Sequence, residues 1–330
     1  MTLQIPKPKT ISRNAQLTKA DRRFARVMTA AAFFSLVVLS LIAIFLVYQA
    51  VPAIRDQGLI QFLTDARWDS GSIGERDSDF VEPIFGIAAM LWGTILIGII
   101  AIILALPISL GLAIFIVFIA SEKIAGVARA IVDFLAAIPS IVYALWAISA
   151  LTLKGREWGE WLTTNLGFIP IFKNDIGIWV GTPLIAGIVL AAMITPIITS
   201  VTREVLSRTP AELVSASLAL GGTLWPTLKY VAFPFAKSGI VAATMLGLGR
   251  ALGETVAVFY VLNLTYGTIN WVGIVSPQGG SIASLIVAKF SEAGALEISA
   301  LLGGGMVLFV ITLIVNAIAT AISRLTITDK

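Results

Sequence analysis

Long apolar runs are the feature that most restricts how this 330-residue chain can fold. A helix needs about 20 apolar residues to cross the roughly 30 Å hydrocarbon core of a bilayer. The sequence contains six such runs, which are Met28–Ala50, Ile84–Ala120, Val127–Leu153, Gly181–Val201, Ser238–Leu264 and Ile298–Ile322. We therefore expect an all-α membrane protein with six transmembrane helices. The second run exceeds one simple span, and Pro107 inside it predicts a kink or a continuation along the membrane surface.

The composition excludes several classes of protein. With 58% hydrophobic and 13% charged residues, the chain is too apolar for a soluble domain or a disordered one. It contains no Cys and no His, which removes disulfide frameworks, thiol nucleophiles, Cys/His zinc sites and histidine bases. No Gly-x4-Gly-Lys-Ser/Thr string occurs, so we expect no ATP hydrolysis by this chain. We expect no cofactor, no metal and no nucleic-acid partner.

The distribution of Lys and Arg predicts the orientation, because cytoplasmic loops carry an excess of basic residues. The N-terminal arm, residues 1–27, holds seven basic residues against one acidic residue, so we place it inside. With six spans, the side of the arm then carries 15 basic and 6 acidic residues, and the opposite side carries 7 and 12. Both termini are expected in the cytoplasm. The first apolar run is longer than that of a cleaved signal peptide, which favours a retained anchor helix.

The runs also predict how the chain is organised. We divide it into a basic cytoplasmic arm (1–27), the first span with an acidic outer loop (28–83), a core of five spans (84–323) that contains a cytoplasmic loop (203–237), and a cytoplasmic tail (324–330).

Two groups of polar and aromatic residues outside the fifth span have simple interpretations. Arg129 and Asp133, four residues apart near the cytoplasmic end of the third span, are expected to form a surface pair. Trp158, Trp161 and Trp179 of the second outer loop are expected at the membrane–water interface, with the docking of an external partner as the alternative.

The cytoplasmic loop after the fourth span has the pattern of two short helices joined at glycine. Thr209 before Pro210 predicts a helix start, and Glu212 completes the spacing of a capping box. Gly221 predicts the end of this helix, and a second amphipathic helix is expected to follow until Pro234. Such a hairpin either binds a cytoplasmic partner or lies on the bilayer surface.

This loop resembles the cytoplasmic signature of ATP-binding-cassette importer permeases, in which Glu-Ala-Ala precedes Gly and then Ile-x-Leu-Pro. The matching residues are Ser215-Ala-Ser217, Gly221 and Val231-Ala-Phe-Pro234. Ser215 stands where the family has Glu, and Glu212, one helical turn earlier, is the candidate substitute. The resemblance implies a coupling helix that docks on a partner ATPase through Glu212, Ser215, Ala216, Ser217, Gly221 and Pro234.

The fifth run carries two charges inside the membrane, Arg250 and Glu254. Residues four apart share one helix face, and even the lower estimates for burying a charge mid-membrane are about 2.5–3.5 kcal/mol. Both residues are therefore expected to face the bundle interior or water. Gly249 and Gly253 form a small-xxx-small pair that lets another helix approach closely. The charged pair is either a structural ion pair or the lining of a path for an oxyanion, whose oxygens match the guanidinium fork.

The string Leu246-Gly-Leu-Gly-Arg-Ala-Leu-Gly-Glu-Thr-Val-Ala-Val258 closely resembles the matching span of phosphate importer permeases of the C type, the PstC family. Ala137-Ile-Pro-Ser-Ile-Val-Tyr-Ala144 is also similar to that family. Sulfate and molybdate permeases share the Arg-Ala-Leu-Gly-Glu part, whereas Thr255-Val-Ala-Val258 favours phosphate. From about Ile84 to the C-terminus, the resemblance implies the MetI-like fold of type I importer permeases.

The same resemblance implies a function. The chain would be a permease subunit of an ATP-driven phosphate importer in the bacterial inner membrane, with Arg250, Glu254 and Thr255 along the substrate path. The implied partners are a related permease subunit in a heterodimer, a dimer of cytoplasmic ATP-binding-cassette ATPases, an external phosphate-binding protein and inorganic phosphate itself. Two alternatives stay open: a permease for sulfate or molybdate, and an ion-coupled secondary carrier that works without an ATPase.

Overall fold

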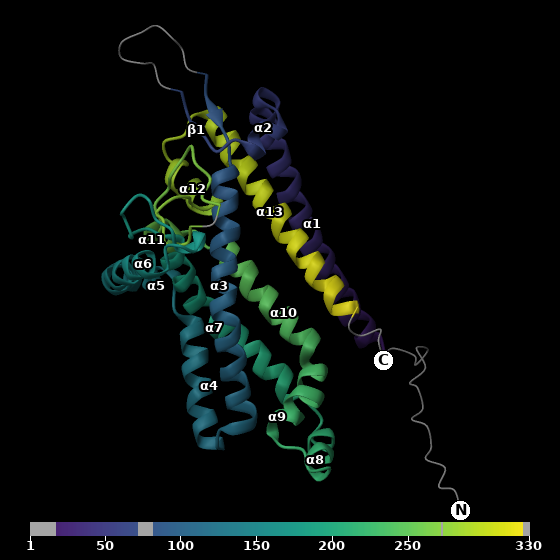
Figure 1. Ribbon diagram of the computed structural model, residues 1–330. Coiled ribbons are helices and arrows are strands. Elements are labelled where there is room, and N and C mark those ends of the chain that lie inside the picture. Colours follow the sequence, from purple (N-terminus) through teal and green to yellow (C-terminus); the bar gives the residue numbers. More distant parts are fainter. Residues whose placement is uncertain (1–17, 72–81, 272, 326–330) are drawn as a thin grey trace, which may run out of the picture. The chain divides into compact units, whose positions relative to one another are not determined.

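The computed structural model describes residues 18–71, 82–271 and 273–325 (Figure 1). It falls into two compact units, Met1–Tyr48 and Gln49–Lys330, which are described separately. In its described residues, the first unit is one continuous helical stretch, the beginning of α1 (Lys19–Gln57). The second unit holds the rest of α1 and all the other elements.

The second unit is almost entirely helical. Its further α-helices are α2 (Leu59–Thr64), α3 (Ala88–Ile114), α4 (Glu122–Ala137), α5 (Ser140–Trp146), α6 (Thr152–Leu166), α7 (Pro183–Ser207), α8 (Ala211–Ala219), α9 (Leu224–Thr227), α10 (Phe233–Leu252), α11 (Val256–Val261), α12 (Ile282–Lys289) and α13 (Ala295–Leu325). Three π-helical turns and one 3-10 turn extend or link them: η1 (Phe115–Ile119), η2 (Ala147–Leu151), the 3-10 turn η3 (Pro170–Phe172) and η4 (Leu228–Ala232). The strands β1 (Trp68–Asp69) and β2 (Ile84–Phe85) pair antiparallel.

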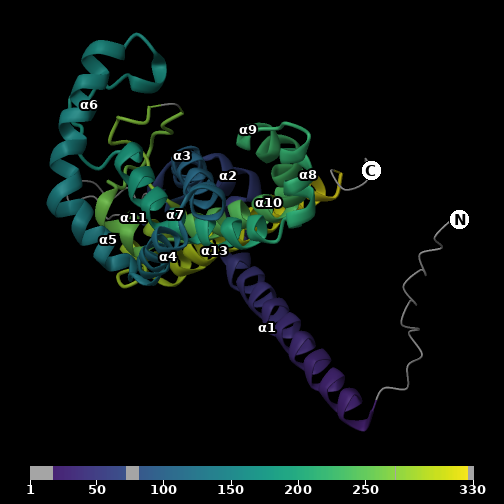
Figure 2. The same cartoon turned by 90° about the horizontal axis from the view of Figure 1, so that it is seen from below.

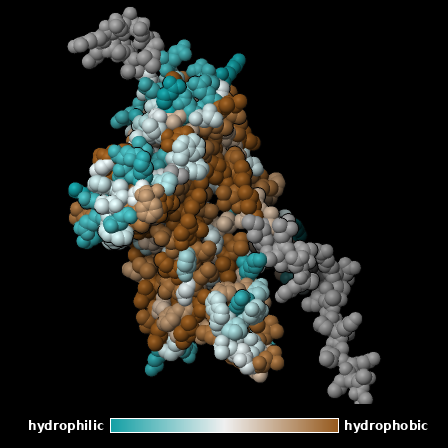
Figure 3. All heavy atoms as spheres, in the orientation of Figure 1, coloured by the Kyte–Doolittle hydropathy of each residue, from teal (hydrophilic) through white to brown (hydrophobic). Residues whose placement is uncertain are grey.

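Five helices in the described parts of the chain are long and apolar enough to cross a membrane, and their bounds are Lys19–Gln57, Ala88–Ile119, Pro183–Ser207, Leu224–Leu252 and Ala295–Ala321. A bent pair, Glu122–Ala137 with Ser140–Leu166, supplies a sixth crossing if it forms one span. Figure 3 shows that hydrophobic surface fills the middle of the second unit on the visible face, between hydrophilic surface at its two ends. The predicted all-α membrane architecture is confirmed.

The third predicted run is not one straight helix. Helix α4 stops at Ala137, Ile138 and Pro139 are extended, and the segment from Ser140 onward leaves at an angle of 93°. A proline has no amide hydrogen to continue a helical ladder, and it disfavours helix at the residue before it. The run is therefore two helices with a sharp bend at Pro139, and it counts as one crossing only if the bent pair forms a single span. By contrast, α3 and η1 continue as one helix through Pro107.

The core of the second unit is built around α7. Of its most apolar window, 61% is buried inside the protein, against 22% for each of the spans that contain α3 and α10. Helix α7 packs on both of these helices and on α4. Two glycines allow the close approach of these helices. Ile100 of α3 occupies the space that a Cβ at Gly187 of α7 would need, and Ile198 of α7 does the same at Gly247 of α10.

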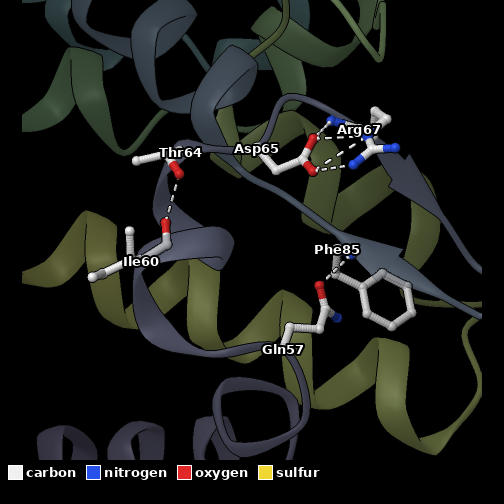
Figure 4. Close-up of polar contacts among 6 residues, drawn as sticks. All are labelled: Gln57, Ile60, Thr64, Asp65, Arg67 and Phe85. Carbon is white, nitrogen blue, oxygen red and sulfur yellow. Dashed lines mark hydrogen bonds and ion pairs between the residues drawn. The ribbon is translucent and has the colours of Figure 1, made fainter.

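The second unit has two unlike ends, with α2, β1 and α12 at one and α8 and α9 at the other (Figure 1). At the first end, Figure 4 shows Gln57 accepting a hydrogen bond from the amide of Phe85 at 2.9 Å, which ties the end of α1 to β2. In the same view, the Arg67 guanidinium binds both oxygens of Asp65, with Nη2 2.7 Å from Oδ2. This pairing holds the pKa of the Asp65 carboxyl below its usual value.

The loop between α11 and α12 is largely buried. Val275 is fully buried, and its carbonyl accepts a hydrogen bond of 3.0 Å from the buried Asn174. Trp92 of α3 donates to the carbonyl of Trp271 at 3.0 Å. The loop is thus packed against α3 and the segment that contains Asn174 at this end of the second unit.

Candidate functional site

The helix that carries Arg250 ends before Glu254. Helix α10 stops at Leu252, Gly253 is its C-cap residue, and a new helix starts at Val256. A glycine inside a helix costs about 1 kcal/mol relative to alanine, because its backbone is freer in the unfolded chain. The prediction that the two charges share one helix face is wrong, since they lie on either side of a break.

The carboxylate of Glu254 caps the second helix, α11. Its Oε1 accepts a hydrogen bond from the amide of Ala257 at 3.2 Å, whereas the half-buried Thr255 at the N-cap position makes no side-chain capping bond. The free amides and the positive end of the helix dipole favour a carboxylate there. Among the described residues, no ion pair joins Glu254 to Arg250. The structural ion pair, one of the two alternatives for these charges, is therefore absent among the described residues in this conformation.

Arg250 is exposed at a cleft of about 460 Å³. The cleft is also lined by Ile197 of α7, by Met245 and Gly249 of α10 and by Asn316 of α13. Within the described parts of the chain, the guanidinium has no hydrogen-bond or ion-pair partner. A Cβ at Gly249 would meet nothing within 4 Å, so the close helix approach predicted there is not made by the described part of this chain. An unpaired cation in an apolar span needs water, an anion or another subunit beside it.

The start of α8 differs from the predicted capping box. Pro210, in an extended conformation, is the N-cap residue, and no side chain caps the helix. Thr209 precedes it, and its buried hydroxyl has no hydrogen-bond partner among the described residues. Pro210 itself has non-helical backbone angles (φ −56°, ψ 126°), so the helix begins one position later than predicted. Glu212 lies in the first turn, exposed, where its charge suits the helix dipole.

The end of α8 is the glycine stop that the sequence predicts. Gly221 has φ +83°, and its amide bonds to the carbonyl of Leu218 at 3.0 Å. The amide of Gly222 bonds to the carbonyl of Ser217 at 3.0 Å, which completes a Schellman motif. The hydroxyl of Ser217 also lies 2.9 Å from that of Thr227, so a hydrogen bond joins α8 to α9.

Helix α8 has almost no packing against the rest of the described chain. None of its residues is buried, and Glu212, Ser215 and Ala216 are all exposed. The turn beyond it presents Leu220, which is 90% exposed, and α9 presents Trp225, which is 64% exposed. A short helix with an uncovered apolar rim gains stability by docking against another surface.

Pro234 does not end a second short helix. Residues from Leu224 to Leu252 form one helical run, and the exposed Pro234 lies just inside α10. The π-helical turn η4 precedes it and locally changes the hydrogen-bond ladder where the proline lacks an amide hydrogen. The predicted helix end at Pro234 is therefore wrong. The chain is continuously helical from Leu224, just after α8, to the end of α10 at Leu252.

The sequence did not indicate two polar contacts that the fold creates. Asp133 does not pair with Arg129, whose Nε binds the carbonyl of Ala125 in its own helix. Asp133 instead accepts a hydrogen bond of 3.0 Å from Ser200 of α7. At the other end of the unit, buried Glu297 of α13 accepts a hydrogen bond from Trp68. Both contacts join segments that are far apart in the chain. The one signal in the sequence was the presence of an acidic residue next to apolar residues, and it does not identify the partner.

Comparison with known proteins identifies relatives over nearly the whole chain. Residues 98–327 match the family model described as "Binding-protein-dependent transport system inner membrane component". The chain is 37% identical over 327 residues to the phosphate transport system permease protein PstC 2 of Mycobacterium tuberculosis, covering 98% of both chains. It is 39% identical over 284 residues to PstC of Mycobacterium leprae, covering 85% of this chain and 86% of that protein. The PstC protein of Haemophilus influenzae is 37% identical over 271 residues, which cover 81% and 80% of the two chains.

Solved structures show the same fold. An inward-facing structure of the MetNI methionine ABC transporter superposes with a TM-score of 0.50 at 19% identity, covering 73% of this chain and 94% of that one. At this identity, the likeness speaks for the fold alone, and it confirms the predicted permease architecture.

Proposed function

The chain belongs to the binding-protein-dependent inner-membrane permeases and, among them, to the PstC family, and on this basis we propose that it imports inorganic phosphate. It is a multi-pass permease component of an ATP-binding-cassette transporter, and ATP is hydrolysed by a partner ATPase. The observation that supports phosphate as the substrate is the 37% identity to a relative named as a phosphate transport permease, over 98% of both chains. The family's usual partners follow from this: a related permease subunit, an ATPase dimer and an external phosphate-binding protein.

We place the substrate path at the cleft beside Arg250. A guanidinium offers a planar fork of donors that matches two oxygens of a phosphate, and it stays charged at any physiological pH. In this conformation, Glu254 is engaged in capping α11 and leaves the arginine unpaired, which is the state an anion would require. Thr255, at the break between the two helices, is the neighbouring polar group available to the path.

We assign ATPase docking to α8 and the turn that follows it. The assignment is supported by the exposure of Glu212, Ser215 and Ala216 and by the uncovered Leu220. Ser217 and Gly221 give this element its shape, and Pro234 lies in the first turn of α10, the helix that leads to Arg250. A displacement of α8 would therefore be transmitted through α10 to the substrate path at Arg250.

We further propose that both termini and α8 lie in the cytoplasm. The excess of basic residues on the side of the arm supports this orientation, as do six crossings when the bent pair is counted as one span. It puts the end with α2, β1 and α12 outside, where an external binding protein would dock (Figure 1). The division into an arm (1–27), a first span with an outer loop (28–83), a permease core (84–323) with a coupling loop (203–237) and a tail (324–330) belongs to the same proposal.

Reconstitution tests this function and its alternatives. The complete importer in proteoliposomes, with the binding protein and ATP, is expected to take up labelled phosphate and to reject sulfate and molybdate. Uptake of sulfate or molybdate in preference to phosphate would assign the chain to those permeases instead. Uptake by this chain alone, driven by an ion gradient without any ATPase, would show a secondary carrier.

A further inference from the structure

A polar contact joins α4 to α7 in the half of α7 that leads to α8. The hydroxyl of Ser200 donates a hydrogen bond of 3.0 Å to Oδ1 of Asp133, and Nη1 of Arg203 lies 3.8 Å from the same oxygen. The Arg203 side chain is only 19% exposed, whereas that of Asp133 is 57% exposed. We refer to Asp133, Ser200 and Arg203 as the α4–α7 polar contact.

Helix α4 exposes most of its side chains. It packs mainly on α7 and on η1, and both of its ends are non-helical joints: Ser121 at one end and Ile138 with Pro139 at the other are extended. Phe134, for example, is 70% exposed. A straight helix between two extended joints is free to tilt as a rigid body once its side contacts are released.

There is space beside α4 into which it can move. An apolar cavity of about 470 Å³ lies between α3, α4, α5 and α7. Its walls include Val132 and Leu135 of α4, Ile108 of α3 and Pro196 of α7. Val132 is the immediate neighbour of Asp133, so the polar contact and the cavity lie next to each other along α4. The cavity is apolar and partly open to the surface, so a tilt of α4 toward α3 would bring these side chains into contact.

The α4–α7 polar contact is itself incomplete. Nη1 of Arg203 is buried and makes no hydrogen bond among the described residues, because 3.8 Å exceeds hydrogen-bonding distance. The adjacent hydroxyl of Thr202 is buried and unbonded as well. Buried polar groups are normally satisfied, so this arrangement favours a second position of α4 in which the pairing differs.

We propose that Asp133, Ser200 and Arg203 are positioning residues that hold α4 on α7 in one state of the transport cycle and release it in another. Helix α7 ends at Ser207 and α8 begins at Ala211, so a pull on the docking helix reaches the contact through a short connection. The contact transmits that movement to α4 and closes or opens the neighbouring cavity. This inference rests on the proposed function where phosphate uptake is measured. The position of α4 relative to α7 can be measured by cross-linking without any substrate.

Because the chain has no native cysteine, the contact can be tested by cross-linking. The double variant D133C/S200C is assembled with its partner subunits in proteoliposomes and treated with a short bifunctional thiol reagent, without nucleotide and with ATP plus vanadate. We expect the cross-linking yield to differ about fivefold or more between the two states, which corresponds to a population shift of roughly 1 kcal/mol. The cross-linked importer is expected to lose phosphate uptake and to recover it when a cleavable reagent is reduced.

Equal cross-linking in both nucleotide states, or full uptake by the cross-linked importer, would overturn the proposal. Failure of the unmodified importer to transport phosphate would count against the proposed function alone, because nucleotide-dependent cross-linking requires no substrate. Recovery on reduction also separates a locked helix from a misfolded variant, since the same molecules are measured twice.

A substitution gives an independent test. D133N should raise the number of ATP molecules hydrolysed per phosphate transported by about threefold or more, since movement of α8 would no longer be transmitted fully. The matched control is E204Q, because Glu204 pairs at 2.8 Å with Arg208, the C-cap residue of the same helix, and both are exposed. The charge-reversed pair D133R/R203D should restore part of the coupling. An unchanged ratio in D133N, equal to that of E204Q, would contradict the role.

Discussion

The indole nitrogen of Trp68 donates a hydrogen bond of 2.8 Å to Glu297, which lies 229 residues further along the chain. The two residues are 7% and 6% exposed, so the bond is shielded from water. Trp68 belongs to β1, and Glu297 lies in the first turn of α13. The described part of the predicted outer loop is thus fixed to the last membrane-spanning helix.

A second residue of α13 reinforces this attachment. The hydroxyl of Ser299 donates to the carbonyl of Gln49 at 2.6 Å and accepts from the amide of Ala53 at 3.1 Å. In an uninterrupted helix, those two backbone groups would bond to each other, so Ser299 has entered the ladder of α1 next to Pro52. The start of α13 therefore forms hydrogen bonds both to the end of α1 and to β1 of the β1–β2 pair.

Replacing Trp68 by phenylalanine should destabilise the protein. The substitution keeps an aromatic ring but leaves the buried Glu297 without its donor, which costs about 1–3 kcal/mol. Thermal unfolding in detergent, followed by near-ultraviolet circular dichroism, should show a lower midpoint. The control is W158F, since Trp158 is 47% exposed on α6. Equal midpoints for the two variants would show that the buried bond contributes nothing.

The positions of the spans could be predicted because a span depends on one local quantity, the length of an apolar run. The run ending near Val201 corresponds to α7, and the stop at Gly221 is set by a backbone angle that glycine accepts readily. These are properties of short segments and do not depend on what surrounds them.

The rest depended on competition between local preferences or on distant neighbours. Pro139 marks the place where the third run is interrupted, but neither run length nor a proline gives the size of the bend, which is 93°. Residues 250 and 254 have helical spacing, yet Glu254 caps α11 instead, because a glycine before it allows a break. The partners of Asp133 and Glu297 are brought by tertiary packing, which periodicity does not encode.

Replacing Gly221 by alanine should weaken ATPase docking. At φ +83°, the Cβ of alanine is strained by about 1–2 kcal/mol, although the space around the position is open. The Schellman motif should loosen and change the path from α8 to α9. The expected result is less ATPase co-purified in mild detergent and a lower ATPase rate stimulated by the binding protein.

The matched control for this variant is G126A. Gly126 lies inside α4, has open space around it and has no left-handed backbone, so alanine there should be neutral or slightly stabilising. Co-purification of the ATPase with G221A at the level of G126A would exclude a role for this backbone geometry in docking.

The ion pair of Asp65 and Arg67 predicts how the end of the second unit that contains α2 and β1 responds to acid. The pKa of Asp65 is lowered by the hydrogen-bonded guanidinium, so folding favours the charged carboxylate. The contribution is fully present above the unfolded-state pKa of about 3.9 and is lost as pH falls through the lower folded-state value. The difference in unfolding midpoint between wild type and D65N should therefore be constant near neutrality and shrink below about pH 4.

The comparison for Asp65 is D69N. Asp69 accepts a hydrogen bond from the amide of Gly71 but has no cationic partner among the described residues. Its substitution should leave the acid branch of the stability curve unchanged. A D65N difference that persisted undiminished at the lowest pH would mean that the variant acts through packing rather than through charge.

Arg250 should determine phosphate uptake by both its charge and its shape. Loss of a charge-assisted hydrogen bond costs about 1.5–3 kcal/mol, so R250A should lower uptake by about ten- to a hundredfold while the subunits still assemble. R250K keeps the charge without the planar fork and should fall between R250A and wild type. The control is R129A, because Arg129 binds only a carbonyl of its own helix among the described residues. Uptake by R250A at the level of R129A would leave the cleft without a role in transport, since the unpaired guanidinium would then serve only the packing of subunits.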